Sequence, residues 1–338
     1  QHESPGYSML YRGTPSMPSA HDQSLAFERL GGMLYAATAT DHGVMSLSLP
    51  PESVAPAIAL LGEVALSPRF SAIDVERRIV SEEILEDVDD DGRPIDADNL
   101  SREQMYDGHP LGFPITGTAA HLATFDEATL AAHHARHYVA DNAVLAIAGA
   151  FDEDALFPAL EAAFARMPRG ARVATDAPAP MPKGGAPRVR YVDSDGSQTD
   201  LRLAFRGPGD HHPMEPATEV LLRVIDDGMS TRLYERICDA QGLCYDVSAA
   251  YETYEDDAVF DFAAETQHAR TPEVARELLA LCAELAEHGP TADELDKVRA
   301  RTAWSTRAML DDPDDLAGFY GLAALANVAR TPSARAEQ

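Results

Sequence analysis

The sequence has 338 residues, of which 45% are hydrophobic and 25% are charged, and its formal net charge is −29. This composition is typical of a globular protein that is long enough for two hydrophobic cores. The acidic balance argues against a nucleic-acid partner, because phosphate binding needs clustered Lys and Arg. No apolar run approaches the length of a membrane span. The three cysteines do not indicate a disulfide framework.

The first half of the chain predicts a hairpin followed by several helices. Residues 33–40 and 44–49 alternate apolar and polar side chains around Asp41-His42-Gly43, which predicts a β-hairpin. Ser53, the Thr124–Glu127 capping box and Asp152 are expected to start helices. The full set of predicted elements in this half is a strand at 143–148 and helices at 21–30, 53–66, 71–86, 99–106, 124–137 and 153–167.

The predicted helix 71–86 carries the most informative pattern of this half. Ser71 is its expected N-cap, and Ile73, Ile79, Val80 and Ile84 recur at helical spacing as a buried stripe. Glu76 and Glu83 are seven residues apart, so they lie on one side of the helix, two turns from each other. Buried glutamates in that arrangement suit a metal site, and a solvated acidic face is the alternative interpretation.

A proline- and glycine-rich tract at 168–187 predicts a linker. After it, Thr291 and Glu294 form a second capping box. The predicted elements of this half are strands at 188–193, 200–205, 244–251 and 258–264, and helices at 215–225, 272–287 and from 291 onward.

The two halves repeat the same order of signals. Gly32, a hairpin, helix 53–66 and a capped helix are matched by Gly242, a hairpin, helix 272–287 and a capped helix. The sequence therefore predicts an α+β fold of two duplicated domains, each an antiparallel-rich sheet with helices packed on it. The expected boundaries are 1–167, a linker at 168–187, and 188–338. The first copy lacks an opening hairpin and the second stops early, so we expect the chain to be clipped at both ends.

Several sequence blocks occur in a fixed order over nearly the whole chain: MLYRGT (9–14), FERLGGMLYAAT (27–38), ERRIVSEEI (76–84), HPLGFPITGT (109–118), HYVADNAVLAIAG (137–149) and DDGMSTRLYERI…GLCYDV (226–247). In these blocks the chain resembles the pitrilysin/insulinase metallopeptidases, in the bacterial branch that is similar to the mitochondrial processing peptidase. The resemblance implies duplicated α+β domains that face each other across a closed chamber. It also implies zinc-dependent cleavage of peptides in active members.

Active members of that family carry an inverted zinc motif, His-x-x-Glu-His, directly before the block that reads MLYRGT here. By the resemblance, the histidine ligands fall on Ser4 and Ser8 and the general base falls on Tyr7. The distant zinc ligand falls on Glu83, with Glu76 as its support. Catalytic zinc usually has three protein ligands, so one carboxylate does not hold it. Pro5 and Gly6 also disfavour the helix that would present the ligands.

The resemblance also predicts peptide contacts in the second half. Active assemblies grip the substrate backbone with an Arg and a Tyr seven residues apart. The Tyr is Tyr245 here, but Cys238 stands at the Arg position. We expect Tyr245 and the turn Asp226–Thr231, which contains Gly228, to contact a peptide.

Other candidate sites are weaker. His133, His134 and His137 have metal-ligand spacing on one helix, but no Glu follows in the required place, and a solvated surface helix explains them better. His211-His212 fits a turn, and His2-Glu3 is out of phase with the zinc motif. Ser4 and Ser8 lack a His partner for nucleophilic catalysis. The acidic run 86–91 lacks the spaced ligands of a calcium loop, and Cys238 and Cys244 are not a Cys-x-x-Cys pair.

We therefore expect a non-catalytic pseudo-peptidase subunit with no bound cofactor, although active relatives use zinc. It would pair with a zinc-bearing subunit of the same family, or self-associate. In that assembly it would form part of the wall of the chamber or bind the peptide. The alternatives are an active zinc endopeptidase with a relocated ligand set and a structural core-type subunit of a larger complex. The sequence does not indicate a compartment.

Overall fold

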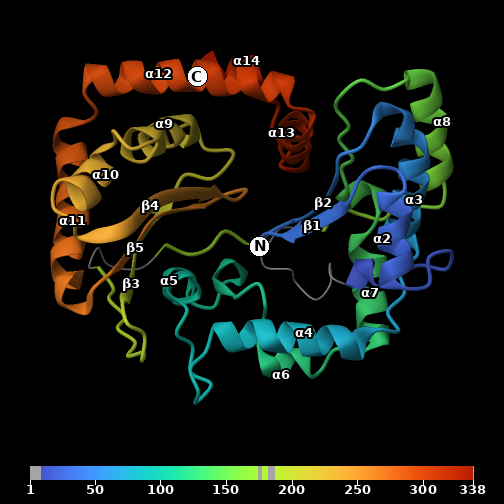
Figure 1. Cartoon of the computed structure of the whole chain (residues 1–338), viewed down its shortest axis with the longest axis horizontal. Coiled ribbons are helices and arrows are strands. Elements are labelled where there is room, and N and C mark those ends of the chain that lie inside the picture. Colours follow the sequence, from blue (N-terminus) through green and yellow to red (C-terminus); the bar gives the residue numbers. More distant parts are fainter. Residues whose placement is uncertain (1–8, 174–176, 182–186, 338) are drawn as a thin grey trace. The chain divides into compact units, whose positions relative to one another are not determined.

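The computed structural model describes residues 9–173, 177–181 and 187–337. It contains two compact units, each built from segments that are far apart in sequence (Figure 1). The first unit contains Gln1–Val88, Pro114–Asp176 and Pro313–Gly321, and the second unit contains Asp89–Phe113, Ala177–Asp312 and Leu322–Gln338. Helices and antiparallel strands occur in both units, as an α+β fold requires. These units are defined by spatial contacts, so the sequence-domain boundaries around 168–187 stay a prediction.

The first unit holds one hairpin and most of the early helices. Its strands β1 (Leu34–Thr38) and β2 (Gly43–Leu47) pair antiparallel, which confirms the predicted hairpin. Its 3-10 turns are η1 (Met9–Tyr11), η2 (Pro51–Ser53) and η4 (Ala140–Asn142). Its helices are α2 (Ala20–Glu28), α3 (Val54–Leu66), α4 (Ile73–Glu86), α6 (Ala119–Leu122), α7 (Glu127–His137), α8 (Glu153–Phe164) and the start of α13 (Pro313–Leu325).

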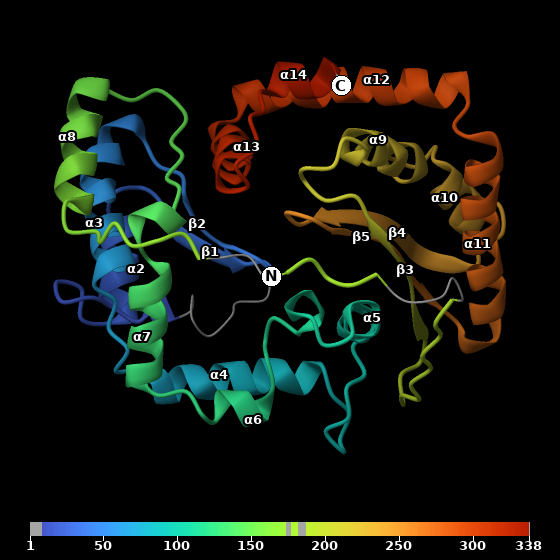
Figure 2. The same ribbon diagram turned by 180° about the vertical axis from the view of Figure 1, so that it is seen from behind.

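One face of the β1–β2 hairpin forms the core of the first unit. Leu34 and Leu47 are directly opposite each other, and both pack on buried Phe27 and Val64 of α2 and α3. The same alternation leaves Tyr35 on the exposed face. Helices α3 and α8 lie side by side in both views (Figures 1 and 2).

The second unit holds a three-stranded sheet with the order β3-β5-β4, all antiparallel. The full set of elements in this unit is β3 (Thr199–Gly207), β4 (Cys244–Thr253), β5 (Ala258–Thr266), α5 (Ala97–Tyr106), α9 (Glu215–Ile225), α10 (Arg232–Tyr234), α11 (Thr271–His288), α12 (Ala292–Asp311), α14 (Pro332–Glu337), the 3-10 turns η3 (Pro110–Gly112) and η6 (His268–Arg270), and the π-helical turn η5 (Glu235–Asp239).

Central strand β5 is covered on both faces. Phe260 and Phe262 point into the main core, where they meet α11 residues that include Leu278. Val259, on the other face, packs against α5 residues Met105 and Tyr106. Helix α5 comes from the first third of the chain, so a local sequence pattern could not predict that it packs on this sheet. Hairpin β4–β5 is followed by α11 and α12, as β1–β2 is followed by α3 and α4, which matches the predicted repeat.

Two predicted strands are absent. Residues 143–148 and 188–193 have no regular secondary structure, and neither segment pairs with a strand among the residues that the structure describes. In the second segment Arg188 donates to the Met105 carbonyl and Arg190 pairs with Glu103 at 2.5 Å. The segment is therefore held by side-chain contacts to α5 and not by backbone hydrogen bonds to a neighbouring strand.

Two predicted helix starts are also wrong. Helix α4 has Ala72 and not Ser71 as its N-cap, with no side-chain cap. Helix α7 begins after Asp126, whose side chain accepts a hydrogen bond from the Thr129 backbone N–H, so the expected Thr124–Glu127 capping box does not form. An aspartate at the N-cap reaches the same donors from a more favourable position. Among the described helices, none is both long enough and apolar enough to cross a membrane.

Candidate functional site

The loop that follows η1 is fixed at both ends by side chains of two helices, buried Gln23 and half-buried Glu63. Gln23 of α2 accepts from the Gly13 N–H at 3.0 Å and donates to the Leu10 carbonyl at 2.8 Å. Glu63 of α3 accepts from Thr14 and from the backbone N–H of Ser16, at 2.6 and 2.8 Å. Burial opposes ionisation of Glu63, but hydrogen bonds from the Ser16 hydroxyl, from Thr14 and from the Ser16 backbone N–H outweigh it and lower the pKa of this carboxyl. The loop is therefore a rigid part of the first unit.

Arg12 projects from this loop onto α4 and forms an ion pair with Glu76. The Arg12 Nε and Nη2 atoms lie 2.6 and 2.5 Å from Glu76 Oε2. The Glu76 side chain is 4% exposed and the Arg12 side chain 23% exposed, so the pair is largely withdrawn from water. The carboxylate of Glu76 is thus already neutralised by a cation of the protein itself.

The burial of α4 differs from the predicted stripe. Glu76, Val80 and Ile84 form the buried face, and Ile79 is exposed. A solvated acidic face is therefore the wrong interpretation for Glu76. Glu83 lies half-buried, two turns further along the same helix.

The remaining members of the predicted zinc motif, Ser4, Tyr7 and Ser8, lie outside the described residues, as does the His2-Glu3 pair. Their roles therefore stay predictions from sequence. Across residues 9–173, 177–181 and 187–337, no three His, Cys, Asp or Glu side chains are grouped closely enough to hold a metal ion.

On α7, His134 and His137 are half-buried, whereas His133 is exposed. His134 Nε2 lies 2.7 Å from the Ala65 carbonyl oxygen, and the imidazole stacks on Tyr138. His133 and His137 stack on each other with ring centroids 4.2 Å apart. Burial lowers the pKa of all three, which favours neutral rings. The other pair of histidines considered as metal ligands, His211-His212, lies in a turn, as predicted.

The acidic run that ends at Asp91 is closed by an arginine. Asp89 accepts from the Asp91 and Arg93 backbone N–H groups, and the Arg93 guanidinium bridges Asp89 and Asp91 at 2.9 and 2.7 Å. These contacts lower the pKa of Asp89, with the backbone N–H of Arg93 as the largest cause. The run is a salt-bridged turn.

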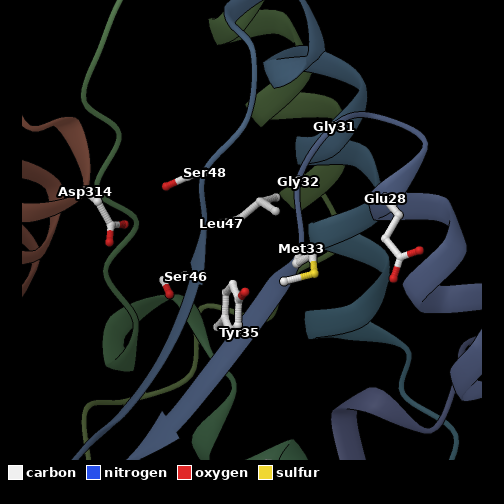
Figure 3. A pocket seen from close by; sticks show the side chains of 9 residues that line it. All are labelled: Glu28, Gly31, Gly32, Met33, Tyr35, Ser46, Leu47, Ser48 and Asp314. Carbon is white, nitrogen blue, oxygen red and sulfur yellow. The ribbon is translucent and has the colours of Figure 1, made fainter.

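The first unit also has an open pocket that the sequence did not predict, beside the exposed face of the hairpin (Figure 3). It has a volume of about 420 Å³ and is lined by Glu28, Gly31, Gly32, Met33, Tyr35, Ser46, Leu47, Ser48 and Asp314. Tyr35 and Met33 are exposed here, and Glu28 and Asp314 add two carboxylates. Gly32 is needed for close packing, since a Cβ there would lie 2.5 Å from the Ser48 carbonyl oxygen.

An exposed strand face beside a pocket can contact an extended peptide. The one sequence signal of this surface is the alternation of residues 33–38, which places Met33 and Tyr35 on the same face of a strand. Within the described residues, β1 and β2 pair only with each other.

In the second unit, the structure places the predicted contact residues at different depths. Tyr245 is 96% exposed, and Gly228 lies in an open turn with φ +109°. Cys238 is half-buried, and its Sγ lies 4.0 Å from that of Cys244. The Cys238 thiol is therefore directed toward Cys244 and the core, whereas Tyr245 is fully accessible.

Two family profiles match the chain. The profile described as insulinase (peptidase family M16) matches residues 7–119, and that described as peptidase M16 inactive domain matches residues 124–302. An uncharacterised zinc protease of Mycobacterium tuberculosis is 30% identical over 290 residues, which are 85% of this chain and 65% of that protein. The chain therefore spans about 65% of the length of the first curated relatives that it matches.

Solved structures show the same fold. A crystal structure of a peptidase M16 inactive domain from Pseudomonas fluorescens has a TM-score of 0.81 at 21% identity, over 96% of this chain and 77% of that chain. A chain of complex III from Candida albicans has a TM-score of 0.71 at 16% identity, over 96% of this chain and 82% of that chain. On the two profile matches, which together cover both halves, the chain belongs to the M16 (insulinase/pitrilysin) peptidase family.

Proposed function

We propose that this chain is a non-catalytic M16 subunit that binds peptide, or walls a peptide-binding chamber, beside a zinc-bearing subunit of the same family. The observation that carries the proposal is that the loop after the zinc-motif position is firmly packed, although the residues at the histidine positions of that motif are serines. The loop of Arg12 is anchored on α2, α3 and α4, whereas Ser4 and Ser8 stand where the family motif has histidines.

The residues present do not fit a catalytic zinc ion. Such sites use three protein ligands drawn from His, Glu, Asp and Cys, and a neutral serine hydroxyl is a poor substitute. Tyr7 cannot act as a general base near neutral pH without a large pKa shift. Of the motif, Glu83 is the single ligand that the sequence keeps, and Glu76 is engaged by Arg12.

Peptide binding is supported by two exposed surfaces. In the first unit, the hairpin presents Tyr35 and Met33 beside the pocket of Figure 3. In the second unit, Tyr245 is almost fully exposed, and Met229 projects from the turn that contains Gly228. Aromatic and methionine side chains of this kind give a peptide apolar contact area without charge.

The test measures metal, cleavage and binding separately. The proposal predicts substoichiometric zinc by atomic spectroscopy, no cleavage of casein or unstructured peptides, and saturable binding of an unstructured peptide. Tyr35→Ser should weaken that binding several-fold. Phe157→Ser is the matched control on α8, because Phe157 and Tyr35 are similarly exposed, at 59% and 55%. Co-purification of a chain with an intact His-x-x-Glu-His motif would support the predicted partner.

The second candidate function is an active zinc endopeptidase, which is favoured by the curated relatives that are named zinc proteases. Stoichiometric zinc that a chelator removes, together with cleavage that the chelator abolishes, would establish that function and overturn the first. A chain with neither cleavage nor peptide binding would be a structural subunit.

A further inference from the structure

Two cysteine thiols meet at the start of hairpin β4–β5 in the second unit. Cys238 lies in the π-helical turn η5, and Cys244 is the first residue of β4. Their Sγ atoms are 4.0 Å apart, and both residues are half-buried. The third cysteine, Cys282 on α11, is also half-buried and serves as an internal reference.

The backbone between the two thiols is held by hydrogen bonds. Leu243 N donates to the Ile237 carbonyl and Gly242 N donates to the Cys238 carbonyl, each at 2.9 Å. The turn is also tied to the strand and helix that follow, because Thr266 Oγ1 donates to the Leu243 carbonyl and Arg270 to the Gly242 carbonyl, at 2.6 and 2.8 Å. The fold itself therefore keeps the two sulfurs together.

A disulfide needs the sulfurs to approach to about 2.05 Å, which is a shift of roughly 2 Å. Side-chain rotation of the two cysteines can supply part of that shift. The π-helical turn can supply the rest, because its backbone departs from regular α-helical hydrogen bonding.

We infer that Cys238 and Cys244 form a thiol modification site that small-molecule disulfides, such as oxidised glutathione, convert to an intramolecular disulfide. The Cys238 thiolate, after losing its proton to solvent, attacks one glutathione sulfur and releases the other glutathione as thiolate. Cys244, also deprotonated, then attacks Cys238 Sγ and releases the second glutathione. Two protein thiols are oxidised, and one glutathione disulfide is reduced to two thiols.

The order of attack follows from the surroundings of each thiol. Burial raises the pKa of Cys244 to about 12, and the neighbouring Cys238 and Asp246 raise it further. Burial also raises the pKa of Cys238, with Asp246 as the nearby charge and the Cys244 thiol opposing the rise. Cys238 is therefore the first nucleophile. Both thiols are mostly protonated at neutral pH, so the exchange is slow there and accelerates as the pH rises.

The site adjoins a residue of the proposed peptide surface. The ladder between β4 and β5 shifts register between Cys244 and Asp246, and Tyr245 projects from that irregularity. A disulfide would tie the residue before Tyr245 to η5. An effect of oxidation on peptide binding would rest on the proposed function, whereas disulfide formation itself does not.

The experiment incubates the purified chain of residues 1–338 with oxidised glutathione at pH 8.5. Thiols are then counted after denaturation, and disulfides are mapped by mass spectrometry. We expect two of three thiols to be lost, the linked peptides to contain Cys238 and Cys244, and Cys282→Ser to behave like the parent chain. Cys244→Ser should retain a glutathione adduct on Cys238. A separate peptide titration of oxidised and reduced chain keeps this test independent of the proposed function.

Three results would overturn the inference. These are three titratable thiols after prolonged incubation, a stable glutathione adduct on Cys238 or Cys244 of the parent chain without a cross-link, or a cross-link that includes Cys282. The parent chain and Cys282→Ser decide the matter even if Cys244→Ser folds poorly, and a circular-dichroism melt establishes whether it does.

Discussion

Removal of Arg12 should destabilise the first unit strongly, because it leaves the Glu76 carboxylate buried without its cation. Loss of one partner from a fully buried ion pair costs about 3–5 kcal/mol. Water reaches the guanidinium of Arg12, whose side chain is 23% exposed, so we expect about 2–4 kcal/mol for Arg12→Ala. Glu76→Gln keeps an acceptor and removes the charge, and it should cost about 1–2 kcal/mol. The double variant should be less destabilised than the sum of the two, because no buried charge remains.

Thermal unfolding followed by circular dichroism measures these differences. A loss of 1 kcal/mol lowers the melting temperature of a unit of this size by roughly 2–4 °C, so Arg12→Ala should melt about 4–16 °C below the parent chain. Asp74→Asn is the matched control, because it breaks the exposed Arg77–Asp74 pair of the same helix, and its cost should be below about 1 kcal/mol. An Arg12→Ala melt that matches this control would refute the role of the pair.

Three further predictions concern the second unit. Hydrogen bonds from Arg232 lower the pKa of Glu294 to about 2, below its ordinary value of 4.5, so its stabilisation is present above pH 4.5 and is lost as the pH falls through 2. Glu294→Gln should flatten the dependence of the melting temperature on pH in that interval. Arg335 pairs with the buried Glu215 at 2.5 Å, so Arg335→Ala should release α14 and abolish its protection in hydrogen exchange, with Arg299→Ala on α12 as an exposed control. Leu278→Ala should cost about 3 kcal/mol in urea unfolding, because Leu278 is fully buried in the main core, whereas exposed Leu279→Ala should cost below about 1 kcal/mol.

Elements with a strong local period could be predicted from the sequence. The hairpin at 33–49, helix α3 and the capping box of α12 all depend on residues that are close together in the chain. The Thr291–Glu294 box forms, and the Thr124–Glu127 box does not, because Asp126 caps α7 instead. Competition between neighbouring cap residues is a matter of geometry that spacing alone does not decide.

The wrong strands fail for a different reason. An apolar or alternating run such as 143–148 or 188–193 becomes a strand only if another strand offers it an edge. Arg188 and Arg190 contact α5, which lies more than eighty residues earlier in the chain, and this contact was invisible to local patterns. The packing of α5 on the second unit's sheet was missed for the same reason.

At the candidate site, too, sequence order could be used for prediction, but contacts between distant residues could not. Residue types at positions 4, 7, 8 and 83 predict a broken zinc motif, because the resemblance depends on sequence order alone. The environment of Glu76 could not be predicted, because Arg12 is 64 residues away in the chain. A helical pattern places Glu76 beside Glu83, but only the folded loop brings a guanidinium to it.

The Arg12–Glu76 pair balances the charge on the buried face of α4 with a side chain of the protein. A buried carboxylate needs a cation or hydrogen-bond donors, because burial alone would raise its free energy by several kcal/mol. Arg12 supplies two N–H donors and a full positive charge to Glu76, and the loop of Arg12 is anchored separately by Gln23 and Glu63. The charge of the buried face of α4 is therefore balanced within the protein itself. We accordingly expect a chelator to leave the melting temperature of this unit unchanged, whereas Arg12→Ala lowers it. If α4 depended on zinc, the chelator would lower the melting temperature and Arg12→Ala would leave it unchanged.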